Sequence, residues 1–232
     1  MLRPVIKQSK EDSVFYDDLF KKWHPKAAPE VRSAVTRALE NSTEVYIAAV
    51  KYLAKYYIVS SPVLVEQLKS RRKADFWIFV QDSLFDMGLL CLCGLMDEGK
   101  DMKNLVKIQS CLPHLKSKSP CPVISDAALS THERVHKQRD HRVAHPLPHK
   151  SVPKQYYGDP ILLCNELLSY IQALHKYLYN GGFGDTMSLR SVVSNEVSGV
   201  CGAMLLEDYA DTIRAEVLAY IDSVIDEGLS EQ

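Results

Sequence analysis

The sequence has little that marks a secreted or membrane-spanning protein. Its first eight residues contain charged and polar side chains and no apolar core, so a secretory signal is not expected. The longest apolar stretch, residues 76–96, is interrupted by Gln81, Asp82 and Asp86. Because charged side chains inside a bilayer are costly, this stretch is predicted to be a buried helix. We therefore expect a cytoplasmic protein with no membrane partner.

Paired cysteine spacings and a strong overall charge are also missing. The six cysteines show none of the short paired spacings that zinc or redox sites use, so we expect reduced thiols. The formal net charge is −1, which by itself indicates neither a nucleic-acid nor a membrane partner. With 46% hydrophobic and 25% charged residues, the composition is that of an ordinary globular protein.

Strand-like alternation and internal repeats are absent as well. The pattern of apolar residues instead has mainly helical periodicity. Apolar side chains recur every three to four residues over long segments, which predicts an all-α helical bundle with accessory helices. The segment 73–96 is apolar on most faces and is expected at the centre of the bundle, with Phe76, Trp77 and Phe79 filling it; the alternative is that this cluster forms a dimer surface. The expected helices cover about residues 30–59, 73–96, 101–111, 125–145, 161–179 and 207–226.

Charge is distributed unevenly along the chain. Residues 131–150 carry five lysines and arginines and five histidines, against Glu133 and Asp140 alone. Residues 205–232 carry an excess of carboxylates, with Arg214 as their one cation. A basic segment and an acidic end therefore coexist in a nearly neutral chain, and the basic segment is where we expect any chemistry.

One motif in the basic segment matches a zinc-binding pattern. His132, Glu133 and His136 form H-E-x-x-H, in which two histidines four apart on a helix share a metal and the glutamate acts as a base. The surroundings disfavour it, because Arg139 and Arg142 stand where one extended zinc motif has glycine and histidine. Guanidinium groups beside a dication also oppose its binding. We expect no metal and no cofactor, and a zinc-dependent hydrolase remains the less favoured alternative.

A second motif overlaps the first and runs from Arg139 through Asp140, His141 and Arg142 to His145 before Pro146. An arginine followed after four to six residues by a histidine occurs three times here, as Arg134 to His141, Arg139 to His145 and Arg142 to His149. Only Arg139 is followed by a polar residue, and only His145 lies in an Ala-His ending before a helix break. This segment resembles the HEPN superfamily, most closely its AbiU-type abortive-infection branch.

The resemblance implies a four-helix core over about residues 30–180, within a single helical domain 1–232, and leaves 181–232 as an acidic helical extension. It implies a metal-independent endoribonuclease of a defence or toxin type that cleaves RNA through 2′-hydroxyl attack. The catalytic residues would be Arg139, Asp140 and His145, because imidazole transfers protons near neutrality and guanidinium stabilises phosphate charge. His141 and Arg142 would bind the substrate backbone.

The same resemblance implies partners: RNA, a second copy of the chain and an antitoxin or regulatory protein. Residues six apart on a continuous helix point about 120° away from each other, so one chain need not close a site alone. We therefore expect a homodimer whose axis passes near the helix that ends at His145. The alternative is a non-catalytic RNA- or protein-interaction module, because cations at a helix C-terminus also stabilise the helix dipole without any function.

Overall fold

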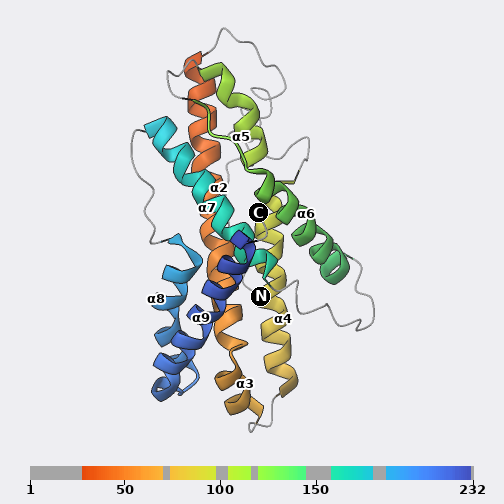
Figure 1. Ribbon diagram of the computed structural model, residues 1–232, viewed down its shortest axis with the longest axis vertical. Coiled ribbons are helices and arrows are strands. Elements are labelled where there is room, and N and C mark those ends of the chain that lie inside the picture. Colours follow the sequence, from red (N-terminus) through yellow and green to blue (C-terminus); the bar gives the residue numbers. More distant parts are fainter. Residues whose placement is uncertain are drawn as a thin grey trace, which may run out of the picture.

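The computed structural model shows an all-α fold, which confirms the predicted class (Figure 1). It describes residues 28–69, 74–97, 104–115, 120–144, 158–179 and 187–230. Within these ranges the chain forms eight α-helices and no strand. The helices are α2 (Ala28–Val59), α3 (Pro62–Lys69), α4 (Ala74–Gly94), α5 (Leu105–Cys111), α6 (Asp126–Arg139), α7 (Asp159–Tyr179), α8 (Leu189–Ala203) and α9 (Ala210–Ser230). Shorter turns of helix cover Leu112–Leu115, Asp140–Ala144 and Glu207–Tyr209.

The long helix α2, and not α4, forms the centre of the bundle. Its 32 residues run along the length of the molecule in Figure 1, and it packs against α3, α4, α5, α7, α8 and α9. Its inner stripe is fully buried at Val35, Leu39, Tyr46, Val50 and Leu53. A helix that is surrounded on several sides must be apolar on several faces. The prediction that residues 73–96 form this central helix is therefore wrong.

Helix α4 instead lies at the side of the bundle. Phe85, Leu89 and Leu92 are buried on its inner face, whereas Phe76 is 54% and Phe79 68% exposed. The prediction that these two phenylalanines fill the core is therefore wrong, although Trp77 does pack against the core. By length and composition, one helix in the described ranges would be able to cross a membrane: the stretch Asp75–Gly94 of α4, with mean hydropathy 1.5 and 28% of it buried.

Helices α3 and α8 are absent from the sequence-based expectations. Helix α8 contains Gly199, Gly202 and three serines, which lower helix propensity. Its Val193, Val197 and Cys201 are nevertheless fully buried, so tertiary burial stabilises a segment that propensity alone does not. The C-terminal helices α8 and α9 share one hydrophobic core with α2 and α7.

Close approach of α2 and α4 depends on Gly88. A Cβ atom at this position would lie 2.7 Å from Cγ and Cδ2 of Leu53, a fully buried side chain. We expect Gly88→Ala to lower the free energy of unfolding by about 1–3 kcal/mol, because overpacking outweighs the better helix propensity of alanine. Urea unfolding measures this. Gly199→Ala is the control, since a Cβ there meets nothing within 4 Å, and equal stability of the two variants would contradict the expectation.

Candidate functional site

The basic segment lies on α6 and on the turn of π-helix that follows it. Ser125 begins α6, as expected, because its Oγ accepts a hydrogen bond from the amide of Ala128. The π-helix covers Asp140–Ala144, and such turns occur frequently at functional sites. Of the predicted site residues, Arg139, Asp140, His141 and Arg142 are described. His145 lies outside the described residues, as do His149 and Lys150.

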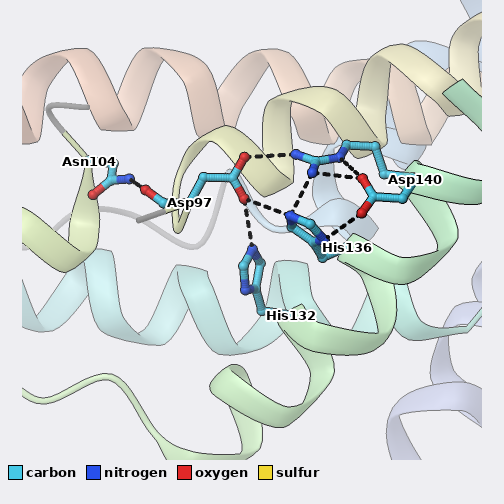
Figure 2. Close-up of polar contacts among 6 residues, drawn as sticks. Asp97, Asn104, His132, His136 and Asp140 are labelled. Atoms are coloured by element: carbon cyan, nitrogen blue, oxygen red, sulfur yellow. Dashed lines mark hydrogen bonds and ion pairs between the residues drawn. The ribbon is translucent and has the colours of Figure 1, made fainter. Parts of the chain in front are cut away.

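Arg139 is the centre of a polar network between α6 and the end of α4 (Figure 2). Its Nη1 donates to Oδ2 of Asp97 at 2.7 Å, and its Nε and Nη2 donate to Oδ1 of Asp140 at 3.1 and 2.9 Å. Nη2 also lies 2.6 Å from Nε2 of His136. The Arg139 side chain is only 18% exposed. These contacts hold the planar guanidinium in one orientation, as charge-assisted hydrogen bonds do.

The ring of His136 takes a definite role between these charges. Its Nδ1 lies 3.2 Å from Oδ2 of Asp140, and its Nε2 faces the Arg139 guanidinium. A guanidinium only donates and a carboxylate only accepts. The neutral ring therefore satisfies both neighbours with its proton on Nδ1, donating to Asp140 and accepting from Arg139. In this way His136 and Asp140 support the arginine from one side, while Asp97 supports it from the other.

His132 lies one turn earlier on α6 and completes the inner side of the network. Its Nε2 is 3.6 Å from Oδ1 of Asp97, and the same carboxylate oxygen is 3.5 Å from Nε2 of His136. Both Nε2 of His132 and Oδ1 of Asp97 are buried without a hydrogen-bond partner. Burial lowers the pKa of His132, and the Asp97 carboxylate only partly opposes this. Besides facing Asp97, the His132 ring forms a hydrogen bond with the backbone of Cys93, which also raises its pKa but does not outweigh burial.

Asp97 is the site residue that sequence reasoning missed. It follows the last turn of α4, and its backbone carbonyl accepts a hydrogen bond from the side chain of Asn104. The same Asn104 caps α5, accepting from the amide of Lys107, so the backbone of Asp97 is tied to the start of α5. The only signal in the sequence was an acidic residue that closes an apolar helix, which does not reveal its partner.

Arg142 is paired in the same manner with two aspartates of α4. Its Nε donates to Oδ1 of Asp86 and its Nη2 to Oδ1 of Asp82, both at 2.8 Å. The guanidinium carbon lies 5.1 Å from the centre of the Phe85 ring, within the range of a cation–π contact. Its side chain is only 17% exposed, whereas His141, the other predicted substrate-binding residue, is exposed. Arg142 is therefore a mostly buried, ion-paired side chain, whereas His141 faces solvent.

The excess of positive charge that the sequence shows in this segment is offset in the fold. Arg134 binds Asp159 at 2.8 Å, and Arg139 and Arg142 each bind two carboxylates. Four of these five partners come from outside the basic segment, and a count of local charges therefore overlooks them. The described part of the segment offers fixed hydrogen-bond donors rather than a strong positive field.

The two histidines of the H-E-x-x-H motif contact Arg139 and Asp97 in the structure. His132 and His136 do share one face of α6, with ring centroids 5.8 Å apart. Glu133 is exposed on another side of the helix, and the Arg139 guanidinium contacts His136 where a metal would bind. No group of three or more histidine, cysteine, aspartate or glutamate side chains suited to a metal ion occurs in the described ranges. All six cysteines, which lie in these ranges, are free thiols.

No protein-family model, curated protein or solved structure matches this chain. What the site can do therefore follows from its own chemistry. It presents a rigid arginine, two histidine rings close to a partly buried carboxylate, and a π-helical turn that leads directly to His145 in the sequence.

Burial of His132 predicts a dependence of stability on pH. Its pKa is lowered from 6.5 in the folded chain, so below pH 6.5 the unfolded chain binds a proton that the folded chain does not. Stability is then fully present above this pH and falls as the pH decreases, by less than about 1.4 kcal/mol per pH unit for one proton. The pKa of His175 is also lowered by burial and adds a loss of the same sign.

Urea unfolding at several pH values between neutral and mildly acidic measures this slope. We expect His132→Gln to flatten part of it and His175→Gln to flatten the remainder. A slope that is unchanged in His132→Gln would show that His132 is protonated as easily in the folded chain as in the unfolded one.

Proposed function

We propose that this chain is a HEPN-like, metal-independent endoribonuclease, with Arg139 as the phosphate-stabilising group and His145 as the acid–base group. The observation that carries the proposal is the fixed Arg139 guanidinium, held by Asp97 and Asp140 where α6 becomes a π-helix. His145 directly follows this π-helix in the sequence and precedes Pro146. A residue before proline is directed away from helical geometry, which frees His145 from the line of the helix.

The reaction needs no metal ion. His145 removes the proton of a ribose 2′-hydroxyl, the 2′-oxygen forms a bond to the adjacent phosphorus, and the bond from phosphorus to the 5′-oxygen breaks. That oxygen takes up a proton, so the products carry a 2′,3′-cyclic phosphate and a 5′-hydroxyl. Arg139 donates hydrogen bonds to the phosphate oxygens, on which negative charge increases in the transition state.

Preorganisation is the contribution of the neighbouring residues. An arginine that is already oriented loses little conformational freedom when it meets a phosphate. The described contacts use four of the five N–H groups of Arg139, and the fifth, on Nη1, remains to bind substrate. In this proposal Asp140 orients the arginine, and Asp97 and His136 are added as positioning residues.

Substrate binding would rest on geometry more than on net charge. Arg142 is neutralised by Asp82 and Asp86, although it and His141 remain the groups nearest in sequence that would contact the RNA backbone. Each lysine or arginine that displaces a counterion steepens the salt dependence of binding. With its arginines already paired, this segment should bind RNA with a shallow dependence on salt. An antitoxin or regulatory protein and a cytoplasmic location are parts of the same proposal.

The pairing of both arginines favours a second candidate, a non-catalytic interaction module. Structural ion pairs need no substrate, and Arg139 and Arg142 each have two carboxylate partners. In that case the network would serve to join the end of α4, α6 and the start of α5. The zinc-dependent hydrolase, with His132, Glu133 and His136, would instead require one zinc ion per chain that is lost in His136→Ala.

Incubation of structured RNA with the purified chain in the presence of EDTA separates these functions. We expect cleavage that is lost in Arg139→Ala and retained in Arg134→Ala, the matched arginine on the same helix that binds Asp159. Cleavage that requires a metal would support the hydrolase. Intact RNA with all variants, or equal cleavage by wild type and Arg139→Ala, would leave the interaction module as the function.

A further inference from the structure

The outer face of α4 carries an apolar seam. Six residues follow one another at alternating spacings of four and three: Phe76, Val80, Ser83, Met87, Leu90 and Gly94. None of them is buried, Phe76 is 54% and Leu90 41% exposed, and a Cβ added at Gly94 would meet nothing within 4 Å. The opposite face of the helix, with Phe85, Leu89 and Leu92, is buried in the bundle. An apolar seam with this spacing is the pattern of a helix that packs along a second helix.

The side-chain sizes along the seam are complementary to the same seam read in the opposite direction. When two copies of α4 cross antiparallel, with the centre at residue 85, Phe76 faces Gly94 of the second copy and Ser83 faces its Met87. Val80 then faces Leu90. Phe76 and Met87 each meet a small residue, and Val80 and Leu90 are of similar size, as close interdigitation of side chains requires.

The charges beside the seam favour a protein over a lipid surface. Helix α4 contains Asp75, Asp82 and Asp86 and no lysine or arginine, whereas a helix that lies on a membrane usually carries cations on its polar face. Asp86, three residues after Ser83 and four before Leu90, borders the seam near its centre, and Arg142 binds it together with Asp82. A charged border around an apolar centre is typical of a protein–protein interface.

We propose that the α4 seam is the interface between two copies of this chain, crossing antiparallel about a two-fold axis near residue 85. Such an axis, perpendicular to the helix pair, keeps the Asp82–Asp86 side of both helices on one face of the dimer. The Arg142 groups of both copies then lie near the axis, and the two π-helices that follow α6 flank it. The axis then lies near α6, where the sequence-based prediction also places it. The proposed interface does not depend on RNA cleavage.

Light scattering or sedimentation of the full-length chain over the micromolar range tests the interface. We expect a dimer for the wild type and a dissociation constant raised on the order of a hundredfold for Leu90→Glu, because an unpaired carboxylate in the centre of an interface is strongly unfavourable. Leu129→Glu on α6 is the matched control, since Leu129 is 44% exposed. It should remain dimeric and, as judged by circular dichroism, all variants should remain folded.

The double variant Val80→Lys, Leu90→Glu tests the antiparallel register. In one chain these positions are about 15 Å apart along the helix, too far to pair. Across the proposed axis each lysine faces the glutamate of the second copy, so the double variant should dimerise more tightly than Leu90→Glu alone. A parallel arrangement would place like charges together and give no rescue.

Several results would overturn the proposal. These are a wild-type monomer throughout the micromolar range, an unweakened dimer in Leu90→Glu, no rescue in the double variant, or dissociation caused by Leu129→Glu, which would move the axis to α6. Flotation with phosphatidylserine–phosphatidylcholine vesicles, lost in Leu90→Glu, would assign the seam to a membrane instead. Each of these results is independent of whether the chain cleaves RNA, so a failure here leaves the proposed function standing.

Discussion

Replacing His145 with alanine should reduce RNA cleavage about 10²–10⁴-fold, the contribution that a positioned acid–base group typically makes. In the proposed mechanism no other group removes the proton of the 2′-hydroxyl, so the loss should appear in the rate of the chemical step. Single-turnover cleavage of a labelled RNA with excess protein measures this rate directly. The fixed guanidinium of Arg139 remains in the variant, and RNA binding should change much less than the rate.

His149→Ala is the matched control, because this histidine stands four residues later in the same basic segment and follows Pro148, whereas His145 precedes Pro146. It should retain most of the activity. Unchanged cleavage in His145→Ala would assign the acid–base role elsewhere, and the described candidates are His136 and His141. A loss of activity accompanied by unfolding would be recognised from the circular dichroism spectrum, and in that case His145→Gln replaces alanine with a side chain closer in size.

Replacing Asp97 with asparagine should affect both stability and activity. Asp97 binds Arg139 at 2.7 Å and faces His132 and His136, and its side chain is 24% exposed. Loss of a hydrogen bond between charged groups in this partly buried position should lower the free energy of unfolding by roughly 1.5–3 kcal/mol. The freed guanidinium should also lose its orientation, so we expect the maximal rate of cleavage to fall more than the affinity for RNA.

Asp82→Asn is the control for this experiment. Asp82, on α4, binds Arg142 of the π-helix that follows α6, at 2.8 Å, but it is 56% exposed. An exposed ion pair contributes about 0–1 kcal/mol, so this variant should be nearly as stable as the wild type. Urea unfolding and cleavage kinetics of both variants, with Asp97→Glu as the conservative substitution, give the comparison. Equal effects at the two positions would show that Asp97 has no special role in holding Arg139.

Most of the fold was predictable because helical periodicity records which side of a helix is buried. The stripe from Val31 to Tyr57 predicted α2, and its residues are buried as expected. Periodicity does not record how many neighbours a helix has. Helix α4 is apolar on its outer side as well as on its inner side. This pattern predicts a helix at the centre of the bundle, but α2 occupies the centre. Exposed Phe76 and Phe79 cannot be told from core residues without the tertiary arrangement.

The site was predictable only where its members are close in sequence. Arg139 and Asp140 are neighbours, and His132 and His136 share a helix face because they are four residues apart. Asp97 lies 42 residues before Arg139, and Asp86 lies 56 before Arg142, so their contacts depend on how α4 and α6 cross. The same crossing neutralises the basic segment, which a local count of charges does not anticipate.

The central claim is tested most directly by the chemistry of the ends that the wild-type chain leaves on RNA. A labelled, structured RNA is incubated with the purified protein in EDTA, and the products are identified by mass spectrometry. We expect 2′,3′-cyclic phosphate and 5′-hydroxyl ends from the wild type and none from Arg139→Ala. Intact RNA, or 3′-hydroxyl ends that form only when a divalent metal is supplied, would rule out the proposed endoribonuclease.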